Sequence, residues 1–230
     1  MKTIGLLGGM SHESSTHYYE MINQGVKARL GGHHSAQSLM YSIDFAELVK
    51  LMDAGEWNEA DAMMVAAAKR LEAGGADCVV LCTNTMHRAA QKIIEAVSIP
   101  FLHIADATAE LIRSQEIDRV GLLGTRATME QDFYRGRLEQ AGLSVVTPID
   151  RDRQRIHDVI FQELCLGIIR DESRDEYRRI MGGLADEGAQ GIILGCTELN
   201  MLVGQNDASI PLFDTTSIHA AKAVDFALSE

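Results

Sequence analysis

An internal repeat is the feature of this sequence that most constrains its fold. Residues 3–9 read TIGLLGG, and residues 119–125 read RVGLLGT. Val120 therefore aligns with Ile4, at an offset of 120 − 4 = 116. Each segment is a short apolar run that ends at a glycine or threonine, which is typical of a buried strand followed by a tight turn.

Two further segments repeat in the same order. Residues 75–87 read GADCVVLCTNTMH and residues 188–200 read GAQGIILGCTELN, at an offset of 188 − 75 = 113. A third pair is IPFLHIADAT, which starts at Ile99, and IPLFDTTSIHA, which starts at Ile210. Any two βαβ units share strands that end in glycine, but the second match continues through the loop after its strand. The sequence therefore indicates a duplicated chain.

The repeat consists of short apolar runs that alternate with longer runs of helical periodicity. In the first half, strands are predicted at residues 3–9, 38–44 and 77–83, and helices at 14–32, 58–76 and 85–97. This alternation predicts parallel sheets covered by helices. We expect an α/β fold with two homologous parallel-sheet lobes of three layers each, related by pseudo-twofold symmetry. The N-terminal lobe would comprise residues 1–101 plus 212–230, and the C-terminal lobe residues 102–211.

When the second pair of segments is overlaid, Thr83 falls on Cys196. Ligands of open parallel sheets bind beyond the carboxyl ends of the strands, and both residues follow a predicted strand. We therefore expect the active site in a cleft between the lobes, with Thr83 on one wall and Cys196 on the other. A thiol and a hydroxyl would then lie on opposite sides of one bound molecule.

Composition excludes several classes of function. Hydrophobic residues make up 46% of the chain, as in ordinary globular proteins. The net charge is -12 and no long basic run occurs, so nucleic-acid binding and attachment to an anionic membrane are not expected. No segment approaches the roughly 20 apolar residues of a membrane span, and the N-terminal residues lack the cleavage pattern of a signal peptide.

The 4 cysteines, Cys78, Cys82, Cys165 and Cys196, form no CxxC pair. This usage favours a reducing, cytoplasmic location. Zinc sites need clustered cysteine and histidine ligands, and the sequence has no such cluster, so we expect no metal.

Four motifs in chain order resemble the cofactor-independent aspartate/glutamate racemase family. They are GLLGGMSHESST, CTNTMH, LLGTRATMEQDFY and GCTE, and the resemblance extends from Gly5 to about His219. It is greatest to the bacterial enzymes selective for the L substrate. The resemblance implies catalysis without pyridoxal phosphate or metal, with two cysteines flanking the α-carbon of an amino acid. The second cysteine corresponds to Cys196, whereas the first is replaced by Thr83, as in the L-selective subgroup.

The chemistry of these two side chains suggests different roles. A thiol has a pKa of roughly 8.5, which loop amides or a helix N-terminus lower, so Cys196 is the expected general base. The Thr83 hydroxyl is a poor base at neutral pH, but it can donate a proton to a carbanion, or cap the next helix. Cys82 should point to the opposite face of its strand and take no part in the reaction. Cys78 and Cys165 are expected in the core.

The loops after the two strands should bind the anionic substrate. Helix starts follow these loops, and their backbone N–H groups favour a carboxylate. Met10 should line the same site, although it could equally fill the core. Met52 stands where many relatives carry glutamine. The expected substrate-binding residues are Met10, Met52, Thr83, Asn84, Thr85, Thr197 and Glu198.

The partner of the substrate's side-chain carboxylate is not predicted by any motif. Lys50 and Arg126 are candidates only because they lie near motifs in the sequence. His87 and His103 are expected to be structural.

We therefore expect an amino-acid racemase that acts on L-aspartate, with L-glutamate as a second substrate, as a cytoplasmic homodimer without a cofactor. Cys196 and Thr83 would be its catalytic residues. Other members of the superfamily remain alternatives, namely a maleate isomerase, a hydantoin racemase or an arylmalonate decarboxylase. A non-catalytic sensor of dicarboxylates is the alternative outside enzymes, because the first thiol is missing.

Overall fold

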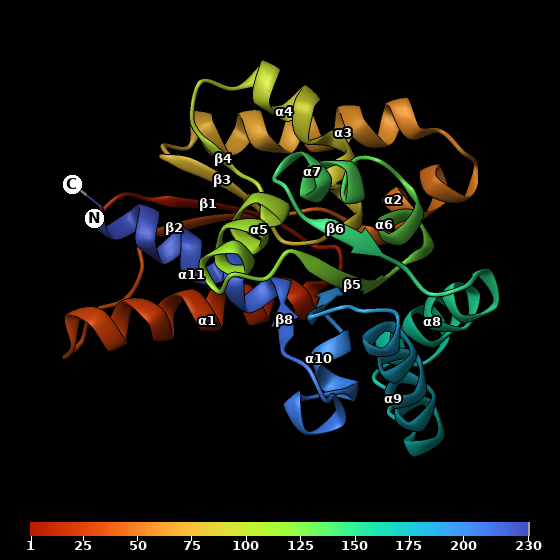
Figure 1. Cartoon of the computed structure of the whole chain (residues 1–230). Coiled ribbons are helices and arrows are strands. Elements are labelled where there is room, and N and C mark those ends of the chain that lie inside the picture. Colours follow the sequence, from red (N-terminus) through yellow and green to blue (C-terminus); the bar gives the residue numbers. More distant parts are fainter. Residues whose placement is uncertain (230) are drawn as a thin grey trace. The chain divides into compact units, whose positions relative to one another are not determined.

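A computed structural model describes residues 1–229, and the chain divides into two compact units (Figure 1). The first unit comprises Met1–Ile104 and the chain from His219 onward. The second comprises Ala105–Ile218. The chain leaves the first unit at the start of one helix, α5 (Ile104–Ser114), and returns within another, α11 (Thr215–Leu228).

The first unit is built on a parallel sheet with the strand order β2-β1-β3-β4. Its strands are β1 (Ile4–Gly8), β2 (Ser38–Ser42), β3 (Cys78–Leu81) and β4 (Phe101–Leu102). The two central strands, β1 and β3, are buried throughout, as expected for a parallel sheet with both faces covered.

Helices cover both faces of this sheet, which gives three layers (Figure 1). On one face, α1 (His12–Leu30) and α11 pack Tyr18, Ile22 and Ala223 against the strands. The other face is covered by α2 (Phe45–Asp53), α3 (Trp57–Ala73) and α4 (Ala90–Ala96). The 3₁₀ turn η1 (Thr85–Ala89) precedes α4. The apolar side chains of these helices pack mainly on β1 and β3.

The second unit has a parallel sheet of the same topology, with the order β6-β5-β7-β8. Its strands are β5 (Arg119–Gly124), β6 (Ser144–Val146), β7 (Gly191–Gly195) and β8 (Leu212–Asp214). Besides most of α5, its helical segments are α6 (Arg126–Glu130), α7 (Arg135–Gln140), α8 (Asp150–Gln162), η2 (Leu164–Leu166), α9 (Asp171–Asp186), α10 (Leu199–Leu202) and η3 (Gln205–Asp207).

The strand registers confirm the duplication that the sequence predicted. Ile4 pairs with Cys78 in the first sheet, and Val120 pairs with Gly191 in the second. The offset of 116 relates the first member of each pair, and the offset of 191 − 78 = 113 relates the second. Thr83 and Cys196 therefore follow equivalent strands, each in its own sheet.

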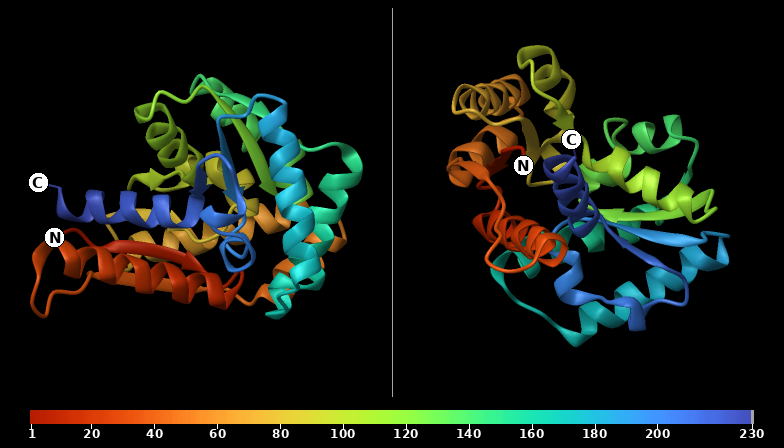
Figure 2. Two further views of the ribbon diagram at one scale, coloured as in Figure 1. Left: turned by 60° about the horizontal axis from the view of Figure 1, so that its bottom comes forward. Right: turned by 90° about the vertical axis from the view of Figure 1, so that its left-hand side faces the viewer.

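The edges of the units differ from the lobes expected from the sequence. Residues 212–230 were expected in the N-terminal lobe, but Leu212 pairs with Ile192 of β7. This pairing places β8 in the second unit, and only from His219 does the chain belong to the first. There the first residues lie beside the end of α11, where the Lys2 amide donates to the Ala227 carbonyl at 2.9 Å (Figure 2).

The GGM turn after β1 depends on glycine. Gly9 has φ +96°, and a Cβ at this position would collide with the backbone of Ile43. Ser11 then caps α1 by accepting a hydrogen bond from the Ser14 amide.

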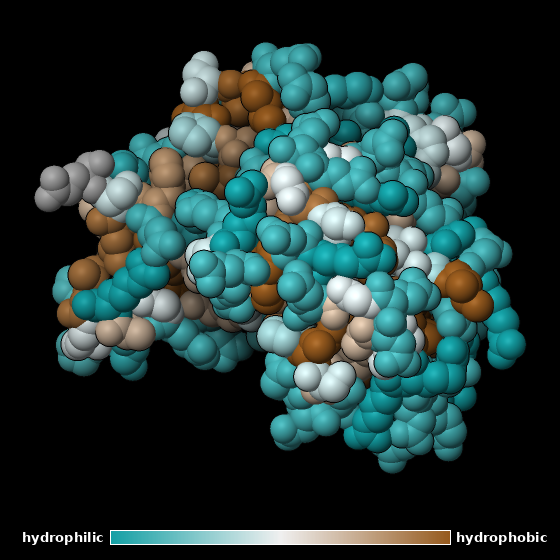
Figure 3. Space-filling model, in the orientation of Figure 1, coloured by the Kyte–Doolittle hydropathy of each residue, from teal (hydrophilic) through white to brown (hydrophobic). Residues whose placement is uncertain are grey.

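No helix among residues 1–229 is long and apolar enough to cross a membrane. The face drawn in Figure 3 is mostly hydrophilic, with apolar residues in small separate groups.

Candidate active site

Cys196 lies directly after β7, in a loop where a carboxylate accepts a hydrogen bond from its thiol. Its side chain is only 8% exposed. Sγ donates a hydrogen bond to Oε2 of Glu198 at 2.9 Å, and the Thr197 hydroxyl donates to the same oxygen at 2.6 Å. One buried carboxylate oxygen thus accepts from both neighbouring side chains, which holds the three residues of the CTE motif together.

The environment of the thiol raises its pKa. Burial is the main cause, and the negative charge of Glu198 and its hydrogen bond to Sγ add to it. The backbone amide of Glu198 lowers the pKa of Cys196, but by less. The expectation of a lowered pKa is therefore wrong for the net shift, because burial and the adjacent carboxylate outweigh the amide. The raised pKa keeps the proton on Sγ, where it is donated to the Glu198 side chain.

Thr83 lies at the corresponding position after β3, in a tightly bonded turn. The amide of Cys82 still donates to the Leu7 carbonyl at 2.9 Å, continuing the pattern of the sheet. The Thr83 amide then turns back to the Leu81 carbonyl at 2.9 Å, and the Thr83 carbonyl accepts from Nδ1 of His87 at 2.7 Å. Thr83 as a residue is partly buried, and both of its backbone polar groups are hydrogen-bonded.

The other cysteines differ from Cys196 in their surroundings. Cys82 is fully buried among Tyr18 and Ala220, on the face of the sheet covered by α1 and α11, and burial raises its pKa. Cys78 lies in the same cluster, and burial raises its pKa to about 12. Cys165 in η2 is only partly buried, so the expectation of a core position is wrong for that residue.

A protein-family model described as Asp/Glu/Hydantoin racemase matches residues 7–223. The chain belongs to this family. It is accordingly an isomerase, and the two-unit α/β fold described above is that of a racemase.

Three similar proteins illustrate the family. A candidate Asp/Glu racemase from Yersinia pestis has a crystal structure with a TM-score of 0.95 and 55% identity, and 100% of each chain is covered. An aspartate racemase homologue from Pyrococcus horikoshii OT3 has a TM-score of 0.86 and 34% identity, again over 100% of each chain. The broad specificity amino-acid racemase RacX of Bacillus subtilis (strain 168) is 25% identical, over 96% of each chain.

The remaining residues expected around the substrate occupy varied positions. Asn84 is buried and Thr85, the first residue of η1, is partly buried. Met10 is 5% exposed and packs with Leu7 in the core, which agrees with the alternative that it fills the core. Met52 is partly buried at the edge of the same cluster. Contact of these residues with substrate stays a prediction.

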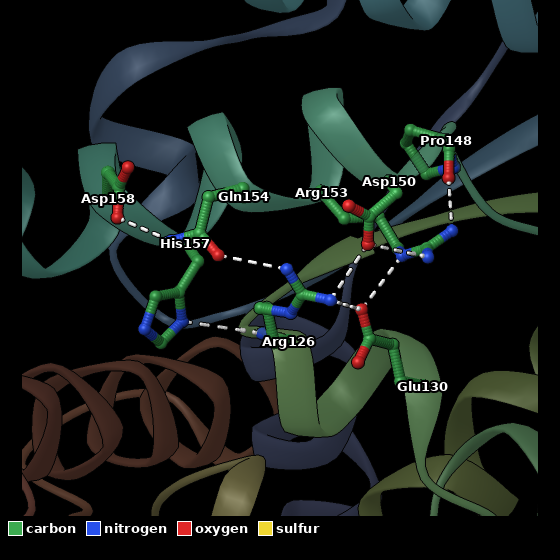
Figure 4. A network of polar contacts seen from close by, with 8 residues as sticks. All are labelled: Arg126, Glu130, Pro148, Asp150, Arg153, Gln154, His157 and Asp158. Atoms are coloured by element: carbon green, nitrogen blue, oxygen red, sulfur yellow. Dashed lines mark hydrogen bonds and ion pairs between the residues drawn. The ribbon is translucent and has the colours of Figure 1, made fainter.

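The two cations suggested by the sequence are already paired within their own units. Lys50, on the exposed face of α2, donates to Glu47 at 2.6 Å. Arg126 begins α6, and its guanidinium donates to Gln154 at 2.9 Å and to Asp150 at 2.8 Å, with Glu130 also at 2.8 Å (Figure 4). Each cation therefore has an acidic partner within its own unit.

Two contacts were not foreseen from the sequence. Glu198 accepts the hydrogen bond of the thiol, and its expected contact with substrate stays a prediction. His87 was expected to be structural, and its partner is the carbonyl of Thr83. The i, i+4 spacing of Thr83 and His87 across a strand end was the available signal for the second contact.

Proposed function

We propose that the chain is a cofactor-independent racemase of L-aspartate, with L-glutamate as a second substrate. The observation that supports it most is the hydrogen-bonded pair of Cys196 and Glu198, at the sheet position that Thr83 occupies in the first unit. A buried thiol beside a carboxylate can exchange protons, and the duplicated position supplies a second group for the opposite face of the same carbon.

In this mechanism the proton of the pair moves from Sγ to Glu198, and the Cys196 thiolate removes the α-proton of the L substrate. The α-proton ends on sulfur, and the electron pair stays on the α-carbon as a carbanion. Thr83 returns a proton to the opposite face, directly or through water, and regains its own from solvent, while Glu198 releases to solvent the proton that it took from Sγ. The amides of the Thr83 and Cys196 loops stabilise the carbanion, and Asn84, Thr85 and Thr197 contact the substrate.

A broader substrate range is the second candidate function. The pairing of Lys50 with Glu47 and of Arg126 with Asp150 and Glu130 favours it, because a dicarboxylate substrate needs an available cation. The relative of Bacillus subtilis is named for broad specificity. We keep aspartate as the first proposal because the motifs resemble those of aspartate/glutamate racemases. We also propose that the enzyme is a cytoplasmic homodimer.

Circular dichroism of L-amino acids incubated with the dialysed, chelator-treated protein tests the proposal. L-aspartate should lose its signal without added pyridoxal phosphate or metal, and a panel of other L-amino acids should change more slowly. Faster racemisation of non-acidic amino acids would support the broad-specificity enzyme instead. Activity that requires added metal or pyridoxal phosphate, or an absence of activity on every member of the panel, would contradict the proposal.

A further inference from the structure

His87 is a buried histidine whose two ring nitrogens make hydrogen bonds of opposite kinds. The Ile104 amide donates to Nε2 at 3.2 Å, and Nδ1 lies 2.7 Å from the Thr83 carbonyl oxygen. A backbone amide can only donate, so Nε2 must be the unprotonated acceptor. The neutral ring then carries its proton on Nδ1 and donates to Thr83. The two contacts together therefore require one tautomer of His87.

These bonds join two separate parts of the first unit. Thr83 follows β3, whereas Ile104 begins α5 and is the last residue before the chain enters the second unit. The ring is only 1% exposed, and it packs against Phe101 at 5.5 Å and His103 at 4.6 Å between centroids. Because the Thr83 amide is also bonded, to Leu81, both backbone polar groups of Thr83 are fixed.

The second unit has a related connection at the equivalent position. The offset of 113 aligns His87 with Asn200, and the third repeat, with an offset of 210 − 99 = 111, aligns His103 with Asp214. Nδ2 of Asn200 donates to Oδ2 of Asp214 at 3.2 Å, which again ties the loop to the end of the last strand. The carbonyl of Cys196 accepts from the Leu199 amide at 3.2 Å instead of from a side chain.

We propose that His87 is a positioning residue for the Thr83 face of the reaction. Its Nδ1–H holds the Thr83 carbonyl, and through it the hydroxyl, in the orientation that returns a proton to the α-carbon. This inference rests on the proposed function. Since His87 acts on the Thr83 loop and not on the Cys196–Glu198 pair, its loss should slow inversion but spare proton exchange on the L face.

The test compares two rates on L-aspartate in deuterated water: deuterium uptake at the α-carbon, and appearance of D-aspartate. For His87→Ala we expect inversion to fall about tenfold to a hundredfold, while exchange falls less than about threefold. His87→Asn should retain more inversion than His87→Ala, because its amide can reach the Thr83 carbonyl. Phe101→Leu is the matched control, because it removes a ring contact of His87 but neither hydrogen bond, and its ratio of rates should match that of the wild type.

The outcomes separate this inference from the proposed function. Absence of both exchange and inversion in the wild type would overturn the proposed function, and this inference with it. Wild-type activity with an unchanged ratio of the two rates in both His87 variants would overturn the role of His87 alone, because a general loss of folded protein lowers both rates equally. Nitrogen-15 NMR of the full-length wild-type protein is independent of any variant. A proton on Nδ1 of His87 is expected, and a proton on Nε2 alone would overturn the inference.

Discussion

Sγ of Cys196 lies 2.9 Å from Oε2 of Glu198, within the buried loop that follows β7. Burial and, next, the adjacent Glu198 raise the pKa of the thiol, so Sγ keeps its proton at rest. Such a pair is poorly nucleophilic at rest, yet it contains both a proton and its acceptor. The proposed reaction depends on this relationship, and a substitution that replaces the carboxylate with an amide of the same size tests it.

Replacing Glu198 with glutamine should have opposite effects on thiol reactivity and on turnover. Glu198→Gln removes the charge and the carboxylate acceptor, so the pKa of Cys196 should fall and iodoacetamide should alkylate it faster at neutral pH. Racemisation should decrease by about a hundredfold or more, because the proton of the pair has lost its acceptor. Alkylation rates followed by mass spectrometry, together with circular dichroism, measure both effects.

Glu163→Gln is the control for that substitution. Glu163 is another buried carboxylate of the second unit, but its partners are the Ser173 hydroxyl, which donates to it, and the Arg155 guanidinium. In Glu163→Gln, iodoacetamide should alkylate Cys196 at the wild-type rate. Slower alkylation in Glu198→Gln than in the wild type would show that the carboxylate activates the resting thiol.

Cys196→Ser should abolish α-proton exchange on L-aspartate, because a hydroxyl in this position is too weak an acid to provide the base. Cys82→Ala should keep exchange near the wild-type rate, since Cys82 lies in the core beneath α1 and α11. It should instead destabilise the fold by about 1 kcal/mol, measured by urea unfolding. An inactive but folded Cys82→Ala protein would reverse the assignment of the two cysteines.

Thr83→Cys should raise the rate of inversion and the rate of exchange on D-aspartate. The substitution places a titratable thiol, with a pKa of roughly 8.5 before any shift, where the hydroxyl is a poor base. Chiral chromatography and proton NMR measure the two rates. Unchanged turnover of D-aspartate would indicate that Thr83 does not face the α-carbon.

His219 should make stability depend on pH. It is fully buried between the Tyr18 hydroxyl, 2.9 Å from Nδ1, and the Leu102 carbonyl, 2.7 Å from Nε2, with the His87 ring at 5.8 Å. Burial lowers its pKa to about 4, below the value of about 6.5 expected in the unfolded chain. The contribution of His219 to the free energy of unfolding is therefore fully present above pH 6.5 and declines as the pH falls toward 4.

The free energy of unfolding should fall by about 2 kcal/mol between pH 7 and pH 5 because of His219. Urea unfolding at the two pH values measures it, and His219→Gln should remove this part of the dependence while lowering stability at pH 7. Equal pH dependence in the wild type and His219→Gln would show that His219 protonates as readily in the folded protein as in the unfolded one.

The sequence predicted the architecture because repetition and apolar runs report strand order and burial. The match of Thr83 with Cys196 was correct since the offset of 113 is also the offset of the strand register. Cys82 lies in the core cluster beneath α1 and α11, and its facing relative to Thr83 stays a prediction. The two expected boundaries, after residues 101 and 211, lie instead after Ile104 and Ile218, the second because β8 continues the second sheet.

The ion-pair partners of charged side chains could not be predicted from the sequence. Arg126 is neutralised by Asp150, 24 residues along the chain, and no local pattern encodes that pairing. The pKa of Cys196 depends on how a buried carboxylate two residues away is oriented, which periodicity does not report. The role of Glu198 in particular required the positions of its oxygen atoms.

The most direct test of the account is the fate of L-aspartate in deuterated water. The two enantiomers have equal free energy, so a racemase must have equal kcat/KM in both directions, and a weak group on one face cannot make it one-way. Its weakness should appear as repeated exchange on the Cys196 face before each inversion. We predict that L-aspartate gains deuterium at the α-carbon faster than D-aspartate appears, while D-aspartate exchanges slowly. Deuterium uptake that simply matches inversion would contradict the pairing of a thiol with a hydroxyl.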